Sequence, residues 1–139
     1  MASLIYDSFV DDVSKGNVTS ADTFYLMLVT SSYVPNKGTH LKRSDVTNEV
    51  GASGTYAAGG AATACVEAKD TGNHWVTWTF TGPSFTSATI TAAAGVIYKH
   101  RGGASTADEL VAYVDFGANI TSTAGTFAVT VSTPLKIAN

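Results

Sequence analysis

The hydrophobic pattern of the second half of the chain alternates with the period of a β-strand. Val76, Trp78 and Phe80 fall on one face of a predicted strand, and the residues between them fall on the other face. Comparable apolar stretches occupy residues 85–91, 96–100, 110–116 and 127–131. The stretches are separated by glycine and proline turn signals at Gly82-Pro83, Gly102-Gly103, Gly117 and Gly125. The pattern therefore predicts five strands of an antiparallel β-sandwich or jelly roll, and argues against alternating strands and helices.

The first half of the chain predicts one short helix before the strands. Ile5, Phe9 and Val13 are spaced four residues apart, and Gly16 follows in a position typical of a helix C-cap. This spacing predicts an amphipathic N-terminal helix at about residues 3–15.

A buried strand and a region of loops are predicted after this helix. Residues 23–30 are almost continuously apolar, which is typical of a central strand that is covered on both faces. A brief helix is predicted over residues 44–50, starting at a capping serine. Residues 51–60 are dense in glycine and alanine, and we interpret them as a loop within the same domain, which spans residues 1–139.

The composition favours a protein that makes permanent contacts with other subunits. Charged residues make up 14% of the 139 residues, and alanine, threonine, serine and glycine are abundant. The net charge of −3 predicts no nucleic-acid partner. The N-terminus has no secretion signal, and no apolar run approaches the length of a membrane span, so we expect no membrane partner and synthesis in the cytoplasm.

Candidate chemistry is sparse in the sequence. The three histidines have no metal-ligand spacing, and no nucleophile elbow or phosphate-binding motif is present, so we predict a non-enzymatic protein without metal or cofactor. Cys65 stands between apolar neighbours and is interpreted as a core thiol. His74 and His100 are interpreted as strand-edge residues, which leaves His40 as the one histidine proposed to contact a partner.

Asp115 lies inside an apolar stretch, where a carboxylate must face solvent or find a partner. Lys99 or Arg101 on a neighbouring strand is the predicted partner, which makes an ion pair a better explanation than catalysis.

Several segments of the chain match, in order, a known kind of protein. Asp22–His40 is the longest of these segments, and it is followed by four shorter ones: Arg43–Val50, Gly54–Gly60, Ala94–Lys99 and Ala112–Gly117. Together they resemble a small virion structural protein that is encoded by many tailed bacteriophages.

This resemblance implies a small β-sandwich or jelly roll on the capsid exterior, most similar to a capsid cement or decoration protein. Such a protein binds the major capsid protein, often as a homo-oligomeric dimer or trimer, and needs no cofactor. Exposed loops on a rigid scaffold are where binding usually concentrates, so the implied docking elements are the N-terminal helix and the loop after the first strand. The candidate partner-binding residues are Phe9, Tyr33, Lys37, His40, Lys42 and Arg43.

Two alternatives stay open at this point. The first is a structural protein of the neck, tail or fibre. The second is a glycan-binding β-sandwich on a phage appendage, in which Trp75, Tyr56 or Tyr33 forms a stacking platform, although the core is the commoner place for such aromatic residues. A hydrolase has no support from the spacing of serine, histidine and aspartate.

Overall fold

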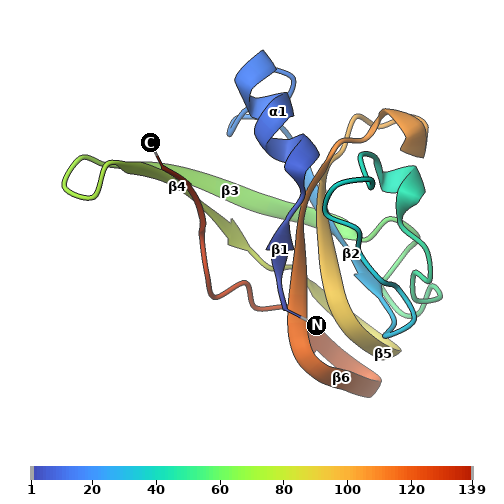
Figure 1. The fold of residues 1–139 in the computed structure, drawn as a ribbon. Helices are drawn as coiled ribbons and strands as arrows, with labels where there is room; N and C mark the ends of the chain where they lie inside the picture. The colour runs from blue at the N-terminus through green and yellow to red at the C-terminus, as the bar shows by residue number, and fades with distance from the viewer. Residues whose placement is uncertain (1, 139) are drawn as a thin grey trace.

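Seven antiparallel strands form one sheet that curls until its two edges approach each other (Figure 1). The computed structural model describes residues 2–138, and the strand order is β1-β6-β5-β2-β3-β4-β7. The elements are β1 (Leu4–Ile5), α1 (Asp7–Lys15), β2 (Phe24–Val29), β3 (Ala61–Asp70), β4 (Trp75–Thr81), β5 (Ser84–Lys99), β6 (Leu110–Ala128) and β7 (Leu135–Ala138), with short 3-10 helices at Arg43–Asp45 and Ser105–Ala107. The predicted mainly β fold with one short helix near the N-terminus is confirmed.

β2 occupies the middle of the sheet, as its continuous apolar sequence predicts. It pairs with β5 on one side and with the start of β3 on the other. All of its residues except Tyr25 are buried, because side chains on both faces of the strand meet apolar neighbours.

β5 and β6 are long bent strands that replace four of the predicted shorter ones. Their ladder contains register shifts, for example between Phe85 and Ala88 and between Ala92 and Ala94. Such irregularities bend and twist a strand without ending it. Gly117, which we expected to mark a turn, lies inside β6 with a positive φ of 82°. The prediction of five separate strands in this half is therefore wrong.

Three strands were not predicted: β1, where a helix was expected, and β3 and β7. β3 is rich in alanine and carries exposed side chains on both faces in its outer half, so it shows little apolar alternation. β7 has a short alternating pattern at the end of the chain, with its odd-numbered residues half-buried. These two strands flank β4 on either side.

The helix begins at Asp7 and not near residue 3, because Leu4 and Ile5 pair with β6 as strand β1. Its end agrees with the prediction, since Gly16 adopts a left-handed conformation and its N–H reaches two carbonyls of the last turn. The predicted helix over residues 44–50 is reduced to the 3-10 turn Arg43–Asp45.

The core has two parts, one on each face of the central strands. The larger part lies inside the curled sheet, where Phe9 of α1 packs edge-on against Trp78 with ring centroids 5.3 Å apart. The smaller part lies under the loop that follows β2 and contains Tyr6, Tyr33 and Tyr98.

Candidate functional site

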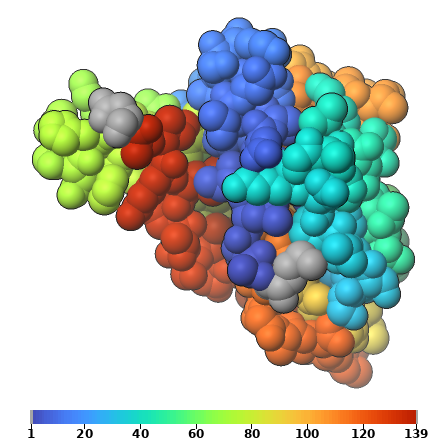
Figure 2. All heavy atoms as spheres, in the orientation of Figure 1, coloured from blue at the N-terminus to red at the C-terminus, as the bar shows by residue number. Residues whose placement is uncertain are grey.

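An apolar cleft of about 820 Å³ follows the seam between the two edges of the sheet. β1 contributes to one wall of the cleft, and residues 128–135, which lead into β7, contribute to the other. Figure 2 shows these terminal segments, in blue and red, beside each other on one face of the molecule. The apolar lining includes Leu4, Ile5, Phe80, Val114, Phe116, Ile120, Phe127, Val131 and Leu135.

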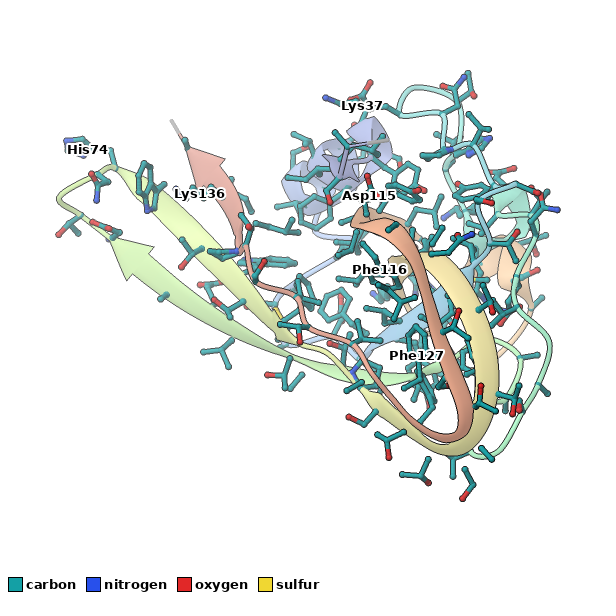
Figure 3. The ribbon with its side chains drawn as sticks, turned by 90° about the horizontal axis from the view of Figure 1, so that it is seen from below. Lys37, His74, Asp115, Phe116, Phe127 and Lys136 are labelled. Atoms are coloured by element: carbon teal, nitrogen blue, oxygen red, sulfur yellow. The ribbon has the colours of Figure 1, made fainter. Side chains whose placement is uncertain are left out.

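β6 supplies the aromatic part of this lining. Phe116 and Phe127 both come from its inner side (Figure 3), and their ring centroids are 6.2 Å apart. Phe116 is only partly buried, whereas Phe127 is 3% exposed. The curled sheet thus leaves part of its apolar interior open to solvent.

The ends of the sheet border this opening as edge strands. β1 pairs with β6, and β7 pairs with β4. In the registers of the described residues, neither β1 nor β7 has a second neighbouring strand. An edge strand presents backbone N–H and C=O groups that can accept another strand. The seam therefore combines an apolar floor with backbone groups suited to an extended peptide.

Few groups along the cleft can perform chemistry. Lys37 and Asp115 lie toward one end (Figure 3), and Lys37 Nζ is 3.9 Å from Asp7. Desolvation raises the pKa of Tyr113, so its phenol stays protonated at neutral pH. The residues that line the cleft in the described chain include no histidine or cysteine that could activate a serine or threonine hydroxyl there.

Asp115 does not meet the basic residues predicted for it. Its Oδ1 accepts the N–H of Gly117, and its own N–H donates to Ser3 Oγ. Lys99 instead pairs with Asp22 at 3.0 Å, and Arg101 pairs with Glu109 at 2.6 Å. The partner prediction is wrong because Asp115 lies opposite Ala94 inside the β5–β6 ladder, whereas Lys99 and Arg101 lie beyond Tyr98, where the ladder ends.

Phe9 and Tyr33, two of the candidate partner-binding residues, lie in the core. Each is 2% exposed. The Tyr33 hydroxyl hydrogen-bonds both to Tyr6 Oη at 2.8 Å and to His40 Nδ1 at 2.9 Å. His40 Nδ1 also accepts the N–H of Asn36, so this half-buried histidine holds its loop in place. Neither Phe9 nor Tyr33 is accessible to a partner in this conformation.

The basic residues of the same loop make internal ion pairs. Arg43 Nε donates to Asp108, which is fully buried, at 2.7 Å, and its guanidinium lies over the Tyr98 ring. Lys42 approaches Glu109 at 3.5 Å. Burial acts to raise the pKa of Glu109, but hydrogen bonds from Arg101 and from the backbone, together with the charges of Lys42 and Arg101, outweigh it and the net shift is downward. Of the predicted cations, Lys37 alone stays largely exposed.

The aromatic candidates for glycan stacking are also buried or in contact with other side chains of the chain. Tyr56 is 1% exposed, and its hydroxyl accepts the N–H of Leu28 and donates to Glu49. Trp75 is half-buried near the tip of the β3–β4 hairpin, where the Lys136 ammonium lies 4.2 Å from its ring centroid.

The remaining candidates for chemistry are Cys65 and the two other histidines. Burial raises the pKa of the Cys65 thiol to about 11, which makes it a poor nucleophile. His100 stacks on Tyr25 at 3.9 Å, as expected of a strand-edge residue, whereas His74 lies exposed in the hairpin turn. No group of three or more potential metal ligands occurs within residues 2–138.

Comparison with known proteins finds no matching family model, no matching curated protein and no matching solved structure. Among the residues that the structure describes, no helix has the length and apolarity needed to cross a membrane.

The cleft itself was not predicted from the sequence. Its traces are the apolar alternation at Val114 and Phe116 and at Phe127, Val129 and Val131, which predicts buried faces but not an open seam.

Proposed function

We propose that this chain is a non-enzymatic structural protein of a tailed-phage virion, in the role of a capsid cement or decoration protein. The sequence segments that resemble such proteins support the proposal. The observation that carries it is the open apolar seam between β1 and β7. An exposed apolar surface beside strand edges is suited to binding another polypeptide, whereas it offers few groups for catalysis.

The occupant that we propose for the seam is an extended segment of the major capsid protein with alternating apolar side chains. Its backbone would pair with the β1 or β7 edge, and its inward side chains would cover Phe116 and Ile120.

Cementing would follow from mass action. A protein that binds the mature shell and not its dissociated subunits stabilises the shell in proportion to the binding free energy. In this proposal the chain acts on the capsid exterior as a dimer or trimer, after synthesis in the host cytoplasm.

The test is co-sedimentation of the purified chain with mature capsids that lack it. Bound copies per shell and the melting temperature of the shell are measured together. Saturation at a fixed ratio to the major capsid protein, with a raised melting temperature, is the expected result. Absence of binding would overturn the capsid role and favour a position in the neck, tail or fibre.

Two matched variants test the seam. Ile120 is 45% exposed and lines the cleft, and its neighbour Thr121 is exposed but does not line it. We expect Ile120→Asp to weaken shell binding by about tenfold, as the loss of roughly 1.4 kcal/mol of apolar contact implies, and Thr121→Asp to bind normally. If instead Leu41→Asp in the loop abolishes binding and Ile120→Asp does not, the cement role stands but docking is through the loop.

A further inference from the structure

Besides the β1 and β7 edges, β3 has an unpaired edge that lies outside the residues lining the cleft. β2 pairs only with residues 61–63 of β3, and β4 pairs with residues 64–70. Within residues 2–138, the other side of residues 64–70 faces no strand. Figure 1 shows the β3–β4 hairpin extending away from α1 and the loops. The free edge is therefore accessible along its length.

The outer face of this hairpin carries small or apolar side chains along residues 64–68 of the free edge. Ala64, Val66 and Ala68 are exposed on this face, and Val66 has 61% of its surface accessible. Across the ladder they meet Thr81, Thr79 and Thr77. Isolated edge strands are commonly protected by proline, bulges or charge. Residues 64–70 contain no proline, and their pairing with β4 has no register shift.

The opposite face carries two charges of opposite sign, Glu67 and Lys69, both exposed. Charges at an edge usually prevent pairing when the signs conflict. Here the two charges are two residues apart, so a strand with the same sequence running in the opposite direction can match each charge with its opposite.

We propose that β3 pairs with β3 of a second copy of this chain, antiparallel, about a two-fold axis at Ala68. This register places Glu67 of each copy directly opposite Lys69 of the other. A register centred on Glu67 would place two glutamates opposite each other. A register centred on Val66 would bring residues 69–70 of each copy onto positions that β2 already occupies.

The geometry of this pair is free of obvious conflict. Antiparallel pairing sends the two bodies in opposite directions, because each body lies at the residue 61 end of its own β3 (Figure 1). The two hairpins and their β7 strands would then form one continuous sheet in the order β7-β4-β3-β3-β4-β7. This inference does not rest on the proposed capsid role, since the contact forms between copies of the isolated chain.

Disulfide trapping tests the register directly. In a Cys65→Ala background, Ala68→Cys places one thiol of each copy at the two-fold axis, where Cα atoms of paired strands are about 4.5–5.5 Å apart and can be bridged. The matched control is Thr79→Cys on the same face of β4, whose copies would lie about 20 Å apart, because three strand spacings and about four residues along the strand separate them. Mild oxidation should yield covalent dimers of the first variant only. No dimer at position 68, or equal yields at both positions, would overturn the proposal.

Charge exchange provides an independent test by sedimentation velocity. Glu67→Lys and Lys69→Glu should each weaken self-association by about tenfold. Either change places like charges opposite each other, and the two-fold axis produces this contact at two places in the dimer. An equimolar mixture of the two variants should associate again, since every lysine then faces a glutamate. Circular dichroism confirms that each variant is folded. A mixture that stays as dissociated as its components would refute the pairing, whatever the chain does on capsids.

Discussion

Replacing Arg43 by methionine should destabilise the fold strongly, although Arg43 lies in a loop. Its guanidinium bonds Asp108 at 2.7 Å, and the two side chains are 20% and 0% exposed. Methionine keeps much of the apolar stem but removes this charge. The Asp108 carboxylate then keeps the Arg101 N–H at 3.0 Å as a donor but loses its guanidinium partner.

The expected cost is about 3 kcal/mol in the free energy of unfolding. Breaking a buried ion pair from one side typically costs about 3–5 kcal/mol, and the partial exposure of Arg43 places this pair at the low end. Asp11 and Lys15 provide a control at a similar distance, with side chains 58% and 61% exposed. Lys15→Met should have little effect on the free energy of unfolding, because exposed pairs are screened by solvent.

Urea denaturation followed by tryptophan fluorescence measures both values, since Trp78 is buried in the core. A double-mutant cycle with Asp108→Ala should show coupling of about 2 kcal/mol between the two positions, because removal of one partner already removes the interaction. If Arg43→Met costs no more than Lys15→Met, or if the Arg43 and Asp108 changes are additive, the loop is not held by this pair and the reasoning fails.

Three further predictions concern the helix, a glycine and an acidic turn. Phe9→Ala should cost about 3–5 kcal/mol in urea denaturation, because a buried aromatic ring is lost from the core and leaves a cavity; a cost below 1 kcal/mol would mean that α1 is not docked as described. Gly60→Ala should reduce the yield of folded protein far more than Gly102→Ala, since both glycines have a positive φ but only at Gly60 would a Cβ overlap a backbone carbonyl of β2; equal effects would contradict this packing. Hydrogen bonds from the backbone N–H groups of the preceding turn lower the pKa of Asp45 below 3.8, so its stabilising contribution is present above that pH and is lost as pH falls through the folded-state pKa. Asp45→Asn should flatten the acid limb of the urea midpoint against pH, and an unchanged limb would show that other carboxylates dominate.

The sequence predicts the parts of this fold that are buried on a regular face. The continuous apolar run of β2 and the alternation of Val76, Trp78 and Phe80 follow directly from the side-chain period of strands. The sequence does not predict β3, because its outer half leaves the body and has no buried face to impose a pattern. It also does not predict that β5 and β6 run through their glycines, since a bend within a strand and a turn between strands use the same residues.

The candidate site was less predictable than the fold for a related reason. The loop at residues 33–43 has the polar composition of a docking loop, yet Tyr33, His40 and Arg43 each direct their polar groups inward. Local sequence shows that these groups need partners but not where the partners lie, because Asp108 is 65 residues away along the chain. The cleft depends on an approach between parts of the chain that are more distant still, since residues 4–5 and Leu135 of the last strand both line it.

These internal ion pairs bear on how the surface can bind. Carboxylates of the same chain form ion pairs with four basic residues, Lys42, Arg43, Lys99 and Arg101. A large share of the few charged residues therefore stabilises the fold. The surfaces that stay open are instead strand edges and apolar or small side chains, at the β1–β7 seam and along β3. Backbone pairing and apolar burial act at short range and depend weakly on ionic strength, whereas long-range charge attraction is screened by salt. A surface of this kind is suited to fixed contacts with defined neighbours, as the proposed structural role would require.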